Sequence, residues 1–160
     1  MSQVLVQLNI ATLVAPLDSP VLADFVADLD RINALAEQSP GFLWRLQSES
    51  GDATELEHGF GENVIVNMSV WESIEALHTY VYKTAHAKVM SRRKEWFERM
   101  TNAYSVLWWI PEGHRPTVGE AQLKLELLQS KGPGPDAFTF KASFPKPSGL
   151  ESEQRQISAK

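Results

Sequence analysis

Apolar and polar residues alternate at the start of the chain, in the segment 3–11, QVLVQLNIA. Val4, Val6, Leu8 and Ile10 fall on one side and Leu5, Gln7, Asn9 and Ala11 on the other. A period of two predicts a β-strand. Similar segments predict three more strands, at 42–47, 62–71 and 102–110.

Helical spacing of apolar residues follows the first strand. It runs over 20–38, where Ser19 is a suitable N-cap and Pro20 suits the first helical position. A second helical stretch is predicted over 73–83, and Thr84 can cap a further helix that continues to 100. Thr117 and Glu120 form a capping box, in which each side chain satisfies a free amide, and it opens a last helix.

The predicted order is β-α-β-β-α-β followed by an extra C-terminal helix. This order is typical of the ferredoxin-like α+β fold, with an antiparallel sheet and helices on one face. We assign 1–131 to this domain and 132–160 to an extended C-terminal tail. Phe138, Phe140 and Phe144 can anchor the tail on the domain, and beyond about Ser148 it is polar and expected to be mobile.

Both faces of the predicted sheet carry apolar residues. In the third strand one row is purely apolar (Val64, Val66, Met68, Val70), and the other is mixed (Ile65, Asn67, Ser69, Trp71). An apolar row left facing water would form a large exposed patch. We therefore expect a homodimer in which the apolar rows of two copies meet, while the mixed rows lie under each copy's own helices.

A histidine and an arginine fall on the apolar side of the helix predicted over 84–100. On a helix of about 100° per residue, Arg93 returns to within about 20° of His86. Tyr82 joins them if the helix extends one turn back. A buried arginine needs a partner, which can be a carboxylate, backbone carbonyls, water or a ligand.

The mixed rows bring further polar side chains to the same interior layer. A cavity with apolar walls and a few polar groups is the usual form of a small-molecule site. The predicted site contains His86, Arg93 and Asn67 as catalytic residues, and Asn9, Trp44, Ser69, Trp71, Tyr82 and Trp96 as substrate-binding residues. The alternatives are a hydrogen-bonded core histidine, an arginine that pairs with a loop glutamate or reaches the sheet edge, and tryptophans that serve only as core.

Composition narrows the function classes. The chain has 160 residues and no cysteine, which excludes disulfides, thiolate metal sites and a cysteine nucleophile. A net charge of −5 without a dominant basic face argues against a nucleic-acid partner. No segment is typical of a signal peptide or a membrane span, so a cytoplasmic location is expected. No zinc, phosphate-loop or nucleophile-elbow motif is present, and we predict no metal.

The strand order and several segments resemble a known superfamily. Asn67-x-x-x-Trp71, followed by a helix arginine, is similar to the antibiotic-biosynthesis monooxygenases of the dimeric α/β-barrel superfamily. The resemblance implies a pocket lined by these residues and oxidation of aromatic substrates without metal or flavin. Asn9 and the strand tryptophan also resemble the haem-degrading branch, but histidines occur only at 78 and 86 in this neighbourhood. The segments "NMSVWESIEAL" and "LWWIPEGHRPTVGEA" look closest to an uncharacterised bacterial family of the superfamily, over about 3–145.

Two functional classes follow, with haem binding as a third option. The first is a cofactor-independent, monooxygenase-like enzyme acting on a hydrophobic aromatic or enolisable substrate. His86 would take a proton, and Arg93 and Asn67 would hold the oxyanion. The second is a non-catalytic binder or sensor of a small hydrophobic ligand. In the haem alternative, His86 or His78 would be the axial ligand.

Overall fold

The computed structural model describes residues 2–16, 18–46, 64–84, 86–99 and 104–147, and the side chains of residues 86 and 89 are outside this description. Four strands form one antiparallel sheet in the order β2-β3-β1-β4. They are β1 (Gln3–Thr12), β2 (Phe42–Arg45), β3 (Val64–Trp71) and β4 (Ser105–Pro111). The predicted ferredoxin-like α+β fold is confirmed.

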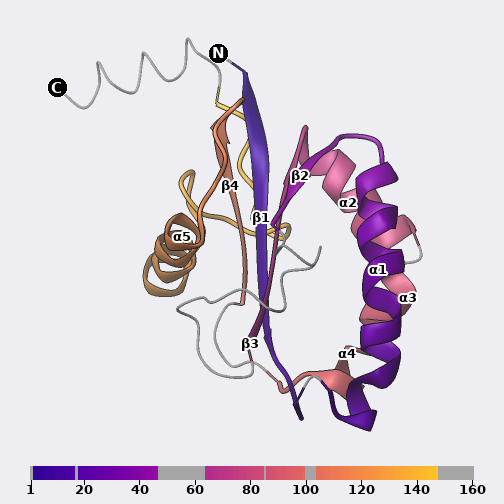
Figure 1. Cartoon of the computed structure of the whole chain (residues 1–160). Helices are drawn as coiled ribbons and strands as arrows, with labels where there is room; N and C mark the ends of the chain where they lie inside the picture. Colours follow the sequence, from indigo (N-terminus) through magenta and orange to yellow (C-terminus); the bar gives the residue numbers. More distant parts are fainter. Residues whose placement is uncertain (1, 17, 47–63, 85, 100–103, 148–160) are drawn as a thin grey trace, which may run out of the picture.

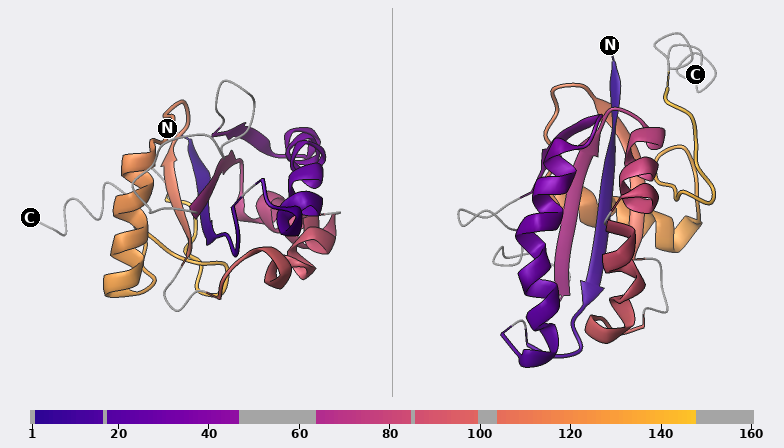
Figure 2. Two further views of the ribbon diagram at one scale, coloured as in Figure 1. Left: turned by 60° about the horizontal axis from the view of Figure 1, so that its bottom comes forward. Right: turned by 90° about the vertical axis from the view of Figure 1, so that its right-hand side faces the viewer.

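Helices lie on both faces of the sheet (Figure 1). One face carries the first four α-helices, α1 (Ala23–Gln38), α2 (Ile74–Lys83), α3 (His86–Ser91) and α4 (Arg93–Trp96). A 3₁₀ turn, η1 (Pro20–Leu22), precedes α1, and α5 (Val118–Lys131) lies alone on the other face. Figure 2 shows α1 running beside the series α2 to α4.

The predicted caps at Ser19 and Thr117 are present, and a further cap is found at the start of α2. The hydroxyl oxygens of Ser19 and Thr117 accept hydrogen bonds from the amides of Val21 and Glu120, and Ser73 caps α2 in the same way. The reciprocal half of the predicted capping box is not formed. The Glu120 carboxylate instead accepts a hydrogen bond from Trp108 Nε1 at 2.9 Å and lies 2.7 Å from His114 Nε2.

The continuous helix predicted over 84–100 is wrong. The segment forms two short helices, α3 and α4, separated at Arg92, whose φ is −98° and ψ 6°. Arg92 bonds Glu95 at 2.8 Å and Asp24 of α1 at 2.9 Å, and its guanidinium lies 4.9 Å from the Trp96 ring centroid. These contacts are made at the break itself. The projection that placed His86 beside Arg93 assumed one continuous helix, so it does not apply across this break.

The apolar row of the sheet is covered within one chain. Val6, Leu8, Met68 and Trp108 form a cluster with Ala121, Leu125 and Leu128 of α5. The premise that helices cover only one face is therefore wrong, because the extra helix packs on the second. The homodimer remains a prediction that has lost this support. The mixed row does lie under the chain's own helices, as expected, with Leu5, Trp71 and Leu107 packed against Leu77 and Tyr80 of α2.

An irregularity in β2 places Phe42 and Trp44 on opposite faces of the sheet, although residues two positions apart in a regular strand share a face. Phe42 pairs with Trp71 and Trp44 pairs with Val70, with a register shift between them. The ring of Phe42 meets that of Trp71 edge to face at 5.4 Å. A bulge adds a residue and reverses the alternation beyond it. Trp44 consequently belongs to the cluster on the α5 face.

The segment after α5 returns to the face of the sheet that carries α1 to α4. Phe138 and Leu107 exchange two backbone hydrogen bonds of 2.8 and 2.9 Å, and the Phe138 ring is fully buried beside Leu5 and Trp71. Trp109 Nε1 donates to the carbonyl oxygen of Phe144 at 3.0 Å. These contacts hold residues 137–144 against β4. The domain boundary at 131 remains a prediction, and the polar end beyond Ser148 lies outside the described residues.

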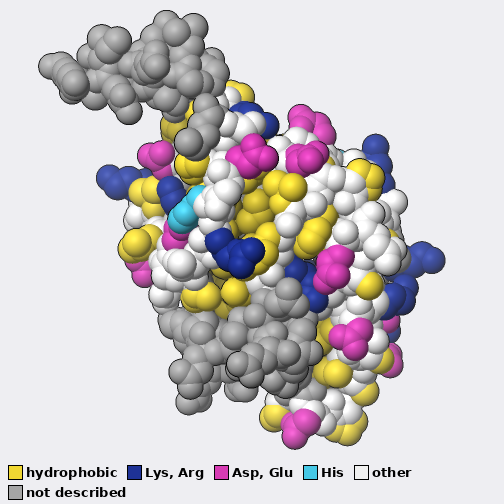
Figure 3. Space-filling model, turned by 45° about the horizontal axis from the view of Figure 1, so that its top comes forward, with side chains coloured by type: hydrophobic (Ala, Val, Ile, Leu, Met, Phe, Trp, Pro, Cys, Tyr) yellow, Lys and Arg dark blue, Asp and Glu magenta, His cyan; other side chains and the backbone are white. Residues whose placement is uncertain are grey.

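Charged side chains of both signs are interspersed on the face shown in Figure 3. None of the helices in the described ranges is both long and apolar enough to cross a membrane.

Candidate functional site

A cavity lies between the sheet and the helices of the α1 face. It has two lobes, of about 140 and 270 Å³, whose linings share six residues: Asn9, Asn33, Arg45, Asn67, Met90 and Arg93. The inner lobe adds apolar side chains, among them Phe25, Leu29, Ile65 and Phe97. The outer lobe adds Ser69, Tyr80, Tyr82 and the C-terminal residues Thr139, Phe140 and Lys141. The cavity therefore has a mainly polar middle, a largely apolar inner end, and an outer end of mixed aromatic and polar side chains.

Arg93 enters this middle from the first position of α4. Its guanidinium carbon lies 4.8 Å from the ring centroid of Tyr104 and 5.6 Å from that of Phe97. No carboxylate of the described residues forms an ion pair with it. Aromatic faces attract a cation but do not neutralise its charge. The cavity thus contains a half-buried positive charge whose donors are available to a ligand.

The two asparagines come from neighbouring strands. Asn9 of β1 and Asn67 of β3 are register partners in the antiparallel ladder. Gln7 Nε2 donates to Asn67 Oδ1 and to Ser69 Oγ, both at 3.1 Å. The Asn9 Oδ1 atom is buried and has no hydrogen-bond partner among the residues that the structure describes. A buried, unsatisfied acceptor costs about 1–3 kcal/mol, so it is a feature that ligand binding can compensate.

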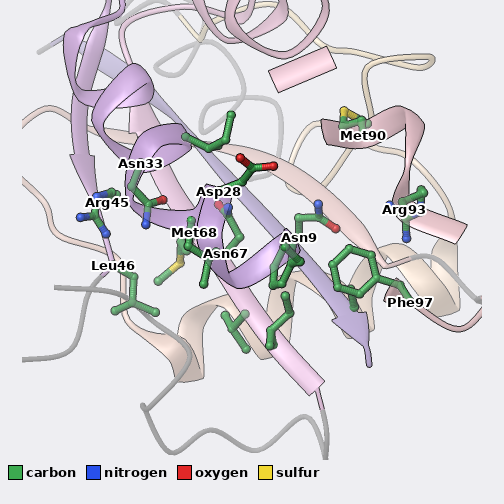
Figure 4. A pocket seen from close by; sticks show the side chains of 16 residues that line it. Asn9, Asp28, Asn33, Arg45, Leu46, Asn67, Met68, Met90, Arg93 and Phe97 are labelled. Atoms are coloured by element: carbon green, nitrogen blue, oxygen red, sulfur yellow. The ribbon is translucent and has the colours of Figure 1, made fainter. Parts of the chain in front are cut away.

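Arg45 and Arg93 lie toward opposite ends of the set of side chains in Figure 4, with the asparagines between them. Arg45 differs from Arg93 because its Nε donates to Glu37 Oε1 at 2.7 Å. Asp28, the carboxylate of the inner lobe, lies 3.0 Å from Arg31. Among the described lining residues, Arg93 and Lys141 are therefore the cations without a carboxylate partner.

Tyr80 forms part of the outer wall. Its ring stacks on Trp71 with centroids 5.1 Å apart, and its hydroxyl donates to the carbonyl oxygen of Ile32 at 3.3 Å. Burial raises the pKa of Tyr80 well above its usual range, and the nearby Arg45 opposes part of that rise. The phenol therefore stays protonated and serves as a neutral hydrogen-bonding group.

Five of the predicted site residues line this cavity: Asn9, Asn67, Ser69, Tyr82 and Arg93. The predicted functional roles of these residues remain predictions, but the expected convergence of the mixed rows and the helix arginine is observed. His86 is the first residue of α3, and its side chain is outside the described part of the structure. His78 is exposed, and its ring contacts those of Tyr82 and Phe140.

The three predicted tryptophan walls are not part of the lining. Trp44 lies on the opposite face, where the Arg115 guanidinium carbon is 5.3 Å from its ring centroid, because the β2 irregularity reverses its side. Trp71 is fully buried beneath the wall, stacked on Tyr80, and donates through Nε1 to Ser69 Oγ at 2.8 Å. Trp96 is buried with Leu13, Leu22 and Phe25 in a separate cluster. Trp71 and Trp96 are core residues, and Trp44 is half-buried on the α5 face.

Several lining residues were missed from the sequence. Arg45 had a detectable signal, since it interrupts an otherwise apolar strand. Asn33 and Asp28 look like ordinary surface positions of α1, and only the packing of this helix turns them toward the cavity. Thr139, Phe140 and Lys141 reach the cavity through the folded-back C-terminal segment, which no local pattern predicts.

Metal-ligating side chains do not cluster in the described ranges, where no group of three or more His, Asp or Glu residues could hold an ion.

Residues 4–154 match the model of a domain of unknown function, DUF3291, and the chain belongs to this family. This match agrees with the expected uncharacterised family, and the superfamily remains a prediction. No curated protein matches the chain.

The solved structures that are similar to this chain include two different proteins. One is a protein of unknown function from Nitrosomonas europaea, with a TM-score of 0.44 and 12% identity, covering 72% of this chain and 94% of that one. The other is SnoaB, a cofactor-independent oxygenase from Streptomyces nogalater. Its TM-score is 0.44 and its identity 16%, covering 74% of this chain and 98% of that one.

Proposed function

We propose that this protein binds a small aromatic molecule with an acidic hydroxyl or carboxyl group in the cavity between the sheet and the α1 face helices. The observation that carries the proposal is Arg93, a half-buried cation held between two rings without a carboxylate partner among the described residues. It lies in the same lining as the unsatisfied acceptor Asn9 Oδ1.

The lining matches such a ligand in three respects. Arg93 would bind the ionised oxygen, because charge-assisted hydrogen bonds are the strongest available to a small ligand. Asn9 Oδ1 would accept a hydrogen bond from a second group, such as a hydroxyl. Apolar side chains of the inner lobe and aromatic side chains of the outer lobe would contact the flat ring.

The reaction that fits this chemistry is a cofactor-independent monooxygenation. A phenol loses its hydroxyl proton, and the phenolate supplies the electrons that reduce O₂. One oxygen atom replaces a ring hydrogen, and the other leaves as water, so that phenol and O₂ give a quinone and H₂O. Arg93 and Asn67 would stabilise the phenolate oxygen. His86 is our candidate base, because the ordinary pKa of histidine is near neutrality.

A non-catalytic binder is the second candidate, and the titratable groups of the lining favour it. Asp28 is the carboxylate among the described lining residues, and Arg31 holds it at 3.0 Å. The raised pKa of Tyr80 keeps its hydroxyl protonated. Catalysis therefore depends on His86, whereas binding does not.

The test combines native mass spectrometry of the protein purified from its own host with oxygen uptake on a panel of naphthols and hydroxynaphthoates. We expect a co-purified acidic aromatic molecule and a quinone product carrying one atom from labelled O₂. Arg93→Gln and His86→Ala should abolish uptake, while Arg115→Gln, an arginine on the opposite face, should retain it. Binding without uptake in every protein would support the binder. A haem absorbance band would contradict both proposals.

A further inference from the structure

Three aromatic rings meet at the outer lobe of the cavity. His78 and Tyr82 are one turn apart on α2, and Phe140 comes from the C-terminal segment. The ring centroids of His78 and Tyr82 are 4.6 Å apart, and those of Tyr82 and Phe140 are 5.9 Å apart. His78 meets Phe140 edge to face at 5.7 Å. Each ring therefore contacts the other two.

Two of these rings form the wall itself. Tyr82 and Phe140 line the outer lobe, while His78 lies behind them. Tyr82 is 51% exposed, although large aromatic side chains usually bury most of their surface. Partly open rings beside a cavity offer flat surfaces on which another ring can stack.

The position of Phe140 is fixed by its neighbours along the chain. Phe138 is anchored to Leu107 by two backbone hydrogen bonds, and the Phe144 carbonyl is held by Trp109. Phe140 lies between these two anchors. Lys141, the next residue, adds a cation to the same lobe. The wall is therefore built before a ligand arrives, which lowers the entropic cost of binding.

We propose that Tyr82 and Phe140 form a subsite for a second flat ring of the ligand, and that His78 positions them from outside. The subsite would recognise a ligand whose acidic group reaches Arg93 and whose further ring extends into the outer lobe. This inference rests on the proposed function, since it assumes that the acidic group binds at Arg93.

The test uses two probes that share an acidic head and differ by one fused ring, salicylate and 3-hydroxy-2-naphthoate. Isothermal titration should show that the wild-type protein binds the naphthoate about tenfold more tightly. Phe140→Leu keeps an apolar side chain but removes the flat ring, so it should abolish the preference while leaving salicylate affinity unchanged. Tyr82→Ala should act in the same direction, and His78→Ala should reduce the preference in part.

Phe42→Leu is the matched control, because the Phe42 ring contacts Trp71 and is not among the lining residues described. It should retain the tenfold preference. An unchanged preference in Phe140→Leu and Tyr82→Ala, with salicylate still weakened by Arg93→Gln, would overturn the subsite and leave the proposed function standing. Failure of the wild-type protein to bind either probe would overturn both.

Discussion

Asn9 and Asn67 are register partners on β1 and β3, but within the described part of the chain only the Asn67 carboxamide oxygen accepts a hydrogen bond. Gln7 Nε2 donates to Asn67 Oδ1 at 3.1 Å, whereas Asn9 Oδ1 is buried without a partner. The fold alone gains nothing from an unsatisfied acceptor at the centre of a cavity. We interpret the difference as a sign that Asn9 is retained for a ligand.

Asn9→Leu should therefore separate stability from binding. The variant removes a buried acceptor that has no partner, and we expect the free energy of unfolding in urea to rise by about 1 kcal/mol. Salicylate affinity should fall at the same time. Asn67→Leu, which removes a satisfied acceptor at an exposed position, should bring no such gain. A clear loss of stability in Asn9→Leu would mean that its side chain has a structural role.

Gly41 joins α1 to β2 at a point where the chain passes close to α2. Its φ is +86°, and a Cβ atom there would lie 2.5 Å from the Ala76 Cβ atom. Gly41→Ala should lower the free energy of unfolding by about 2–4 kcal/mol, from backbone strain and the clash together. Gly113 has a similar φ of +95° with nothing within 4 Å of the added atom. Gly113→Ala should show the strain alone, about 1–2 kcal/mol. Equal losses would contradict the close approach of α2.

The packing of α5 on the apolar row can be tested with two leucines of the same helix. Leu125 is buried against the sheet, and Leu123 is 67% exposed. Leu125→Ala should lower the free energy of unfolding by about 2–5 kcal/mol, since it leaves a cavity. Leu123→Ala should change it by no more than about 0.5 kcal/mol. Similar effects at the two positions would show that α5 does not cover this face in solution.

Stability at high pH should depend on Tyr80. Burial raises the pKa of Tyr80 in the folded protein, while the unfolded chain ionises near the reference value of about 10. The unfolded state therefore loses its proton first, and the contribution of Tyr80 to stability, complete below about pH 10, declines as the pH rises further. Urea titrations from pH 8 to 11 should show a steeper decline for the wild-type protein than for Tyr80→Phe. A decline of equal steepness in the two proteins would contradict this role of Tyr80.

The sequence predicted the sheet and the polar middle of the cavity through local alternation. Asn9, Asn67 and Ser69 fall on the face that carries α1 to α4, because each occupies the mixed row of a regular strand. The alternation of sides in a regular strand predicts these positions correctly, but it gives the wrong side for Trp44, because β2 is not regular. One irregularity in β2 reverses the side on which the following residues point.

Tertiary contacts explain the remaining differences. Arg92, at the break between α3 and α4, donates a hydrogen bond to Asp24, which is 68 residues away in the chain, and no local pattern indicates such a contact. The burial of the apolar row depends on where α5 packs. The apolar side of α5 can be recognised in the sequence, but the sequence pattern does not specify which surface that side will cover. The aromatic wall of the outer lobe likewise depends on the return of the C-terminal segment along β4.

The most direct test of the account is the affinity of salicylate for the wild-type protein, Arg93→Gln and Arg115→Gln, measured by isothermal titration. Both arginines stack on aromatic rings, but they lie on opposite faces of the sheet. We expect Arg93→Gln to weaken binding by about 10- to 100-fold, the value of a charge-assisted hydrogen bond, and Arg115→Gln to leave it unchanged. Equal affinities in all three proteins would contradict the assignment of the cavity as an anion-binding aromatic site.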